Sequence, residues 1–233
     1  MKKFKILRFE NGNIFNLDDF VVEEKILNVF ANGELVQSVF YSNKNEFYLA
    51  LGVLFYNNII VSKNEILNYS SKENDFSVNL HFEIVSKRSK SIDFNEINKI
   101  DVIKASSLFT LMKQTLTHSN VFAITGGTHI VSVATKDNLL AYFEDISRLS
   151  AVLKVVGFLV DNEMRDETLL FTSGRINYNI VQIASKINSK IIVSQSAVST
   201  LAIKSGDSLN ITLVGFLRGN RFNIYSHPER ISQ

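Results

Sequence analysis

Three short segments of glycine and small polar residues have the composition of anion-binding turns. Each follows an apolar run, and they are Thr125-Gly126-Gly127-Thr128-His129, Thr172-Ser173-Gly174-Arg175 and Ser194-Gln195-Ser196. In open α/β sheets, ligands bind beyond the carboxyl ends of the strands, and helices that begin there offer unpaired N–H groups to an anion. Glycine allows the ligand to approach the backbone closely. The three turns therefore predict a site for a phosphate or a similar anion.

Each turn also has a purely structural interpretation, and the sequence leaves both open. Gly126 and Gly127 would suit a tight turn between two strands. Ser173 and Ser196 would suit the N-caps of the helices that follow them. His129 would serve as a hydrogen-bonded structural residue or as an acid–base group.

Arg175 favours the anion interpretation. It falls in the first turn of the helix predicted over 176–187, where a cation is unfavourable against the helix dipole. A bound anion or a nearby carboxylate would remove that cost.

A further helix is predicted over 144–160 by an apolar stripe at helical spacing. The stripe consists of Ile146, Leu149, Leu153, Val156 and Val160. On this prediction, Glu144 and Asp145 lie at the N-terminal end of the dipole, and Arg148 pairs with Glu144 four residues away. The sequence favours this structural role for the charged residues over a catalytic one.

The composition excludes several kinds of chemistry. The chain of 233 residues contains no cysteine, which excludes disulfides, thiolate nucleophiles, persulfide carriers and zinc sites that need cysteine ligands. No metal site is predicted. The formal net charge is only +2 with spread basic residues, so we expect no binding to nucleic acid or to a membrane. Without a signal peptide or an apolar run of about 18 residues, a soluble cytoplasmic protein is expected.

The first part of the chain, residues 1–100, has the pattern of a mostly β, α+β module. Asn32-Gly33 predicts a hairpin because both residues tolerate positive φ. A helix is predicted within 44–58, and residues 87–101 are polar enough to form a linker or an exposed loop. The predicted strands are 4–9, 26–31, 35–41, 59–62 and 76–86.

The second part, residues 101–233, alternates predicted strands with helices. This order indicates a mixed sheet with helices packed on it, so the whole chain has an α+β to α/β pattern. The predicted strands are 121–124, 130–134, 168–172, 190–194, 211–215 and 222–225, and the predicted helices are 104–117, 144–160, 176–187 and 197–205.

These segments, in this order, resemble the formate dehydrogenase accessory sulfurtransferases of the FdhD/NarQ type. That family has a "TGG-x-H" turn, an "EDVGRHNA-x-DK-x-x-G" helix, a "TSGR" turn, a "SVSAPTslA" segment and a "TLVGFxRGxxxxxY…PERI" ending. The matching segments here are "TGGTH" at 125–129, "EDISRLSAVLKVVG" at 144–157, "TSGR" at 172–175, "SQSAVSTLAI" at 194–203 and "ITLVGFLRGNRFNIYSHPERI" at 211–231. The first part, "NVFANGELVQSVFYSNKNEFYLALGVLFYNNII", is similar to the family more loosely.

The resemblance implies a cytidine-deaminase-like second domain that binds a guanine nucleotide. GDP would stand for the nucleotide arms of the molybdenum bis(guanine dinucleotide) cofactor, which such proteins sulfurate for formate dehydrogenase with sulfur from a cysteine desulfurase. It also implies a cytoplasmic homodimer. The positions that match the family's cofactor-binding residues are Thr125, Gly126, Gly127, His129, Arg148, Ser173, Gly174, Arg175, Ser194, Ser196 and Arg218, and Glu144, Asp145, Gly215 and Gly219 also match.

Two departures from the family pattern bear on function. The paired-cysteine "CGxCG" loop is replaced by "SKRSKSIDFNE" at 86–96, so the family's persulfide relay cannot run on this polypeptide. In the helix motif, the family's His and later Asp become Leu149 and Leu153, which we expect to be packing residues.

Three functions fit these observations. The first is the family role in maturation of a molybdenum formate dehydrogenase. The second is a non-catalytic relative, a pseudo-sulfurtransferase or chaperone that binds the cofactor's nucleotide phosphates. The third is a divergent enzyme on the same fold with His129 as the acid or base.

Overall fold

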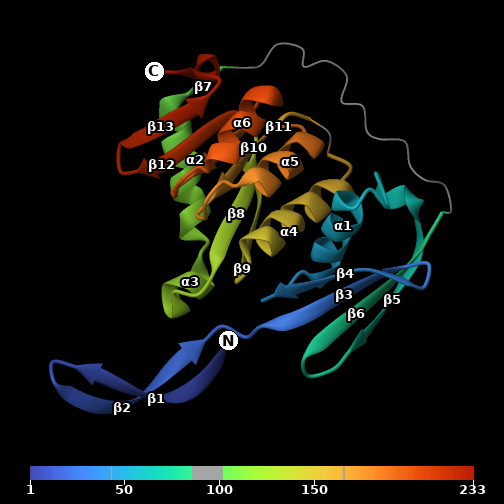
Figure 1. Cartoon of the computed structure of the whole chain (residues 1–233), viewed down its shortest axis with the longest axis vertical. Helices are drawn as coiled ribbons and strands as arrows, with labels where there is room; N and C mark the ends of the chain where they lie inside the picture. The colour runs from blue at the N-terminus through green and yellow to red at the C-terminus, as the bar shows by residue number, and fades with distance from the viewer. Residues whose placement is uncertain (43, 86–101, 165) are drawn as a thin grey trace.

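The computed structural model describes residues 1–42, 44–85, 102–164 and 166–233. Two sheets, one in each part of the chain, contain most of the strand residues, and helices α1 and α4 lie between them (Figure 1). The prediction of mixed α+β architecture with helices flanking a mixed sheet is confirmed. The predicted linker at 87–101 and the boundary at residue 100 lie outside the described residues.

The first part contains a free hairpin and a four-stranded sheet. The hairpin is β1 (Lys2–Glu10) with β2 (Asn13–Val21). The sheet has the order β4-β3-β6-β5 and is covered on one face by α1. Its elements are β3 (Lys25–Ala31), β4 (Glu34–Tyr41), α1 (Glu46–Tyr56), η1 (Lys63–Glu65), β5 (Ile66–Glu73) and β6 (Ser77–Ile84). The predicted Asn32-Gly33 turn joins β3 to β4, with φ of 49° and 87° at its two residues.

The second part is built on a six-stranded sheet of order β13-β12-β11-β10-β8-β9. Strands β10, β11 and β12 are parallel to one another, and the outer strands are antiparallel to their neighbours. The strands of this sheet are β8 (His129–Ala134), β9 (Leu139–Asp145), β10 (Thr168–Thr172), β11 (Ser189–Ser194), β12 (Thr212–Arg218) and β13 (Arg221–Ser226). A separate two-stranded sheet pairs β7 (Ile103–Lys104) with β14 (Ile231–Ser232), and the short helix η2 (Pro228–Arg230) precedes β14.

Helices cover both faces of this sheet (Figure 1). Along each central strand the side chains alternate, so Phe171 and Val193 pack against α2, while Leu170 and Ile192 belong to the core formed with α4 and α5. The helices are α2 (Ala105–Thr117), α3 (Asn120–Thr125), α4 (Arg148–Asp161), α5 (Tyr178–Lys186) and α6 (Thr200–Ser208). None of the helices in the described segments is long and apolar enough to cross a membrane.

Helices α1 and α4 cross in backbone contact at two glycines. A Cβ atom added to Gly157 of α4 would lie 1.8 Å from the carbonyl oxygen of Tyr48 in α1. A Cβ atom added to Gly52 of α1 would lie 1.9 Å from the carbonyl oxygen of Leu153 in α4. The predicted packing role of Leu153 is confirmed, because its side chain is fully buried in this shared core.

Two predicted strands are wrong. Residues 59–62 form bends that close the end of α1, where the buried Ile60 packs into the core. Residues 121–124 lie in α3 and not in a strand. The carboxylate of Glu144 explains this helix, because it accepts hydrogen bonds from the N–H groups of Val121 (3.0 Å) and Phe122 (2.6 Å) at its first turn.

The predicted start of the helix at residue 144 is also wrong. Glu144 and Asp145 end strand β9, and α4 begins only at Arg148. Glu144 therefore does not pair with Arg148 across one helical turn. Ser147 is the N-cap instead, and its Oγ accepts a hydrogen bond from the N–H of Ser150 (3.3 Å).

Candidate functional site

The sheet topology brings several of the predicted residues to one edge. Strand β8 is antiparallel to β10, so His129 at its start lies at the same edge as Thr172 at the end of β10. His129 is paired with Asp145 at the end of β9, and Thr172 with Ser194 at the end of β11. The loops that follow these strand ends therefore meet at this edge, as expected for ligand sites in such sheets.

A pocket of about 290 Å³ opens at this edge of the sheet. It lies where α4 and α5 begin, so the N-terminal ends of two helices face it. Its lining residues are His129, Ile146, Ser147, Arg148, Leu149, Asn177, Asn179 and Ile180. We call it the Arg148 pocket.

The lack of a side chain at Gly174 leaves the space through which the Arg148 side chain enters the pocket. A Cβ atom at Gly174 would lie 2.4 Å from Cδ of Arg148 and 3.5 Å from Nδ1 of His129. The arginine side chain therefore crosses the backbone of the "TSGR" turn directly over the glycine. Its Nη1 donates a hydrogen bond to the carbonyl oxygen of Arg175 at 3.4 Å. The turn thus fixes the direction of the Arg148 guanidinium.

The serines of the turns form hydrogen bonds within the protein. Oγ of Ser173 accepts a hydrogen bond from the N–H of Ile130 at 3.1 Å. Oγ of the buried Ser194 donates to the carbonyl oxygen of Gly174 at 2.6 Å and accepts from the N–H of Ser196 at 2.8 Å. Ser173 and Ser194 therefore hold the strand ends together beside the pocket.

The predicted N-caps and the position of Arg175 need correction. The N-caps of α5 and α6 are Asn177 and Ser199, not Ser173 and Ser196. Arg175 is exposed and precedes Asn177, so it lies outside the first turn of α5. The helix dipole therefore does not destabilise the charge of Arg175, and this position gives no reason to expect an anion.

The charges around the pocket are positive and uncompensated. Among the described residues, neither Arg148 nor Arg175 forms an ion pair, and no carboxylate lines the pocket. Burial lowers the pKa of His129, and the positive charges of Arg148 and Arg175 lower it further. Burial and the neighbouring Arg175 also lower the pKa of Arg148. The pocket therefore favours an anion in its centre.

Of the predicted site residues, His129 and Arg148 line the pocket, while Gly174 and Arg175 lie beside it. The other candidates lie outside it. The segment Thr125–Gly127 ends α3, where Gly126 has a φ of 66°, and the interpretation as a turn after a strand is wrong. A Cβ atom on Gly127 would lie 2.9 Å from Cγ2 of Val22, so this turn packs against the base of the β1–β2 hairpin. Nε of Arg218 donates to the carbonyl oxygen of Gln195 at 2.8 Å.

Sequence patterns missed a buried ion pair behind the pocket. Nζ of Lys154 lies 2.6 Å from Oδ2 of Asp145, and both side chains are completely buried. Oδ1 of Asp145 accepts hydrogen bonds from the N–H groups of Ser42 (3.1 Å) and Ser147 (3.0 Å), and Lys154 donates to the carbonyl oxygen of Ser42 (2.8 Å). The pair therefore ties the end of β4 to the residue that precedes Arg148. Lys154 interrupts the otherwise apolar run 151–160, and this was the available signal.

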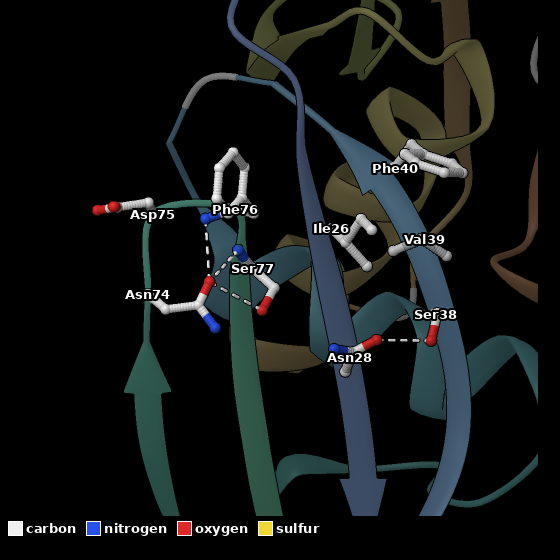
Figure 2. Close-up of a pocket in the computed structure, with 9 residues that line it drawn as sticks. All are labelled: Ile26, Asn28, Ser38, Val39, Phe40, Asn74, Asp75, Phe76 and Ser77. Atoms are coloured by element: carbon white, nitrogen blue, oxygen red, sulfur yellow. Dashed lines mark hydrogen bonds between the residues drawn. The ribbon is translucent and has the colours of Figure 1, made fainter.

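A second hollow, of about 600 Å³, lies on the outer face of the four-stranded sheet (Figure 2). The polar side chains of this hollow form hydrogen bonds within the protein. Oδ1 of Asn74 accepts hydrogen bonds from Phe76 N (2.9 Å) and Ser77 N (2.8 Å), and Oγ of Ser38 donates to Oδ1 of Asn28 (2.6 Å). No cation lines this hollow, so it lacks the chemistry of the Arg148 pocket.

The fold is similar to that of a solved structure over almost the whole chain. A solved structure described as a formate dehydrogenase accessory protein from Desulfotalea psychrophila superimposes with a TM-score of 0.84 over 99% of both chains, at 21% identity. A much weaker match, with a TM-score of 0.36 over 47% of this chain, is the dCMP deaminase of the cyanophage S-TIM5.

The sequence comparisons identify the family. The FdhD/NarQ family matches residues 85–232. The sulfur carrier protein FdhD of Sulfolobus acidocaldarius is 32% identical over 99% of this chain and 98% of its own length. The chain belongs to the FdhD/NarQ family.

The electrostatics of the pocket can be tested through the pKa of His129. We expect Arg148→Met to raise this pKa, because it removes one of the two positive charges that oppose protonation. Proton–carbon NMR of the imidazole across a pH titration measures the value. Arg218→Met is the control, since Arg218 is not among the groups that shift His129. Equal shifts in both variants would contradict the assigned electrostatics.

Proposed function

We propose that this chain is a formate dehydrogenase accessory protein that binds the nucleotide phosphates of the molybdenum bis(guanine dinucleotide) cofactor and carries no sulfur itself. The observation that carries the proposal is the Arg148 pocket, where Arg148, with Arg175 beside it, lies between two helix N-termini and neither arginine has an ion-pair partner among the described residues. Such an arrangement binds phosphate through charge and backbone N–H groups together.

The size of the pocket supports one phosphate-bearing arm as the ligand. Ligand pockets for drug-sized molecules usually measure about 300–1,000 Å³. At about 290 Å³, the Arg148 pocket suits a diphosphate with part of its nucleoside and is too small for the complete cofactor. Arg148 and Arg175 would hold the phosphate oxygens, and Asn177 and Asn179 would contact the rest of the arm. The bound cofactor would supply the molybdenum centre.

Because the chain contains no cysteine, we propose that it does not carry sulfur as a persulfide. A persulfide carrier needs a thiolate, and none of the 233 residues is cysteine. If a cysteine desulfurase supplies sulfur for this cofactor, the acceptor thiol belongs to another protein. The partners proposed for this chain are formate dehydrogenase and a second copy of itself.

A divergent enzyme that uses His129 is the second candidate. The imidazole lines the pocket, and its lowered pKa favours the neutral form that can accept a proton. Its side chain makes no hydrogen bond to the described residues, whereas a catalytic base is usually oriented by a third group. The structure therefore favours binding over acid–base chemistry.

Binding of GDP tests the proposal directly. Isothermal titration calorimetry should detect GDP binding to the unaltered protein, and Arg175→Ala should weaken it by roughly 1.5–3 kcal/mol through the loss of a charge-assisted phosphate contact. Lys113→Ala is the control, because it removes one exposed positive charge from α2, away from the pocket. No binding at millimolar GDP, or equal losses in both variants, would contradict the proposal.

A further inference from the structure

The β1–β2 hairpin stands apart from the rest of the fold (Figure 1). It forms a separate two-stranded sheet, and its outer edges pair with no other described strand. Its main contact with the body is with α3, near the base of the hairpin. An isolated two-stranded hairpin is at best marginally stable in water. Packing against another surface would therefore stabilise this hairpin.

Both faces of the hairpin are rich in exposed apolar side chains. The register pairs Phe4 with Asp19, Ile6 with Leu17 and Arg8 with Phe15, so these residues share one face, which we call the Phe4 face. The opposite face, the Leu7 face, carries the remaining apolar residues, Leu7, Phe9, Ile14 and Phe20. On the Phe4 face, Phe4 is 52% exposed and Phe15 is 46% exposed. Such contiguous apolar surface marks an interaction site.

The Phe4 face has a symmetric distribution of charge. Most of its apolar residues lie in the middle, around the pair Ile6–Leu17, and Val21 lies at one end, paired with Lys2. Lys2 and Asp19 lie toward one end, and Arg8 and Glu10 lie toward the other. Lys2 pairs with Glu23 at 2.9 Å, whereas Arg8, Glu10 and Asp19 have no ion-pair partner among the described residues.

The Leu7 face lacks this symmetry. Lys5 and Asp18 lie in its middle, and Asp18 already pairs with Lys3 at 2.9 Å. Its apolar residues Leu7 and Phe9 are displaced toward the tip. A second copy of the same face would therefore place Lys5 over Leu7 and Lys3 over Phe9, with no unpaired carboxylate beside either lysine.

We propose that two copies of this chain associate by stacking their Phe4 faces antiparallel, about a two-fold axis through the Ile6–Leu17 pair. This operation places Arg8 of one copy over Phe4 of the other, beside Asp19, and places Glu10 near Lys2 of the other copy. Each unpaired charge then meets an opposite charge, Arg8 gains a cation–π contact, and the apolar centre is covered. The inference specifies the surface of the homodimer proposed above and is independent of the Arg148 pocket.

Charge reversal at the predicted contact tests the interface. Sedimentation velocity on the full chain should show a dimer for the unaltered protein. Arg8→Asp and Asp19→Arg should each weaken the dimer by at least roughly tenfold, because each creates two like-charge contacts across the axis. An equimolar mixture of the two variants should associate again, since every contact then joins opposite charges, and native mass spectrometry should identify the mixed dimer. Lys5→Asp, the same charge change on the Leu7 face, should leave the dimer intact.

The outcomes separate the interface from the homodimer itself. A monomer across the micromolar range would overturn both. A dimer that withstands Arg8→Asp and Asp19→Arg would overturn this interface and leave the homodimer standing. Failure of the two variants to associate when mixed, or an equal effect of Lys5→Asp, would show that the contact between Arg8 and Asp19 is wrongly assigned.

Discussion

Gly157→Ala is expected to destabilise the protein severely, although alanine normally favours a helix. The added methyl carbon would lie 1.8 Å from the backbone carbonyl oxygen of Tyr48, so the two helices have to separate. A backbone atom cannot move aside as a side chain does. Overpacking of a rigid core typically costs 1–3 kcal/mol, and the backbone clash places this variant at or above roughly 3 kcal/mol. Urea denaturation followed by circular dichroism measures the loss.

A second helical glycine provides a matched control. A Cβ atom on Gly206 in α6 would meet Cδ1 of Leu213 at 2.8 Å, which is a side-chain atom that can shift. Gly206→Ala should therefore stay within about 1 kcal/mol of the unaltered protein, since the gain in helix propensity partly offsets the crowding. If the two variants lose the same stability, the contact between the helix backbones is not the reason.

Lys154→Met is expected to cost roughly 3–5 kcal/mol, because it leaves the Asp145 carboxylate buried without a counter-charge. Lys186→Met is the matched control. Nζ of Lys186 donates to the carbonyl oxygen of Tyr56 (2.9 Å) and to Oδ1 of Asn58 (2.8 Å), so its removal leaves no buried charge and should cost about 1 kcal/mol. In the double variant Asp145→Asn with Lys154→Met, much of the stability should return. Equal losses for both lysine variants would contradict this account.

The pH dependence of Lys154→Met gives an independent check. Burial raises the pKa of Asp145, and the Lys154 ammonium opposes that rise. Removing the lysine raises the folded-state pKa further above the unfolded value. Stability from such a group is full below the unfolded pKa and is lost as pH rises through the folded pKa. The stability gap between variant and unaltered protein should therefore narrow toward acidic pH, and a gap that widens there would contradict the assignment.

The sequence predicts those helices, strands and turns whose local residue pattern alone is enough to determine the structure they form. The Asn32-Gly33 turn requires positive φ and produces the β3–β4 hairpin. Asn11-Gly12, with φ of 50° and 82°, joins β1 to β2 by the same mechanism. Strand β2 escaped prediction because both of its faces carry apolar and polar residues, so no clean alternation marks it.

Elements that depend on distant partners could not be predicted. The run Val121–Ile124 has β-branched and aromatic residues typical of a strand, but Glu144 from β9 caps it as a helix. Strand β9 itself was assigned partly to the following helix, because the helical spacing that begins at Ile146 hides the strand end at Asp145. Tertiary contacts override local propensity in both cases.

The sequence predicted the turn residues of the candidate site but not the other residues that line the pocket. The strand-end turns and the family resemblance predicted Gly174, Arg175, His129 and Arg148, and the structure brings these four residues together. Asn177 and Asn179 are ordinary residues near a helix start, and only the position of α5 brings them to the pocket. Leu149 follows the apolar stripe and yet also lines the pocket, since it lies at the border between core and opening. Their role in binding stays a prediction.

The backbone contact between α1 and α4 at the two glycines also helps to position the Arg148 pocket. Arg148 is the first residue of α4, and the same helix meets α1 in backbone contact further along, at Leu153 and Gly157. A fluctuation that lifts α4 away from α1 would also displace Arg148, and an anion bound as proposed would oppose it. By mass action, a ligand that binds only the closed arrangement stabilises the crossing by RT ln(1 + [L]/Kd). If the proposed ligand binds, its occupancy of the Arg148 pocket and the packing of the two parts of the chain against each other would be linked.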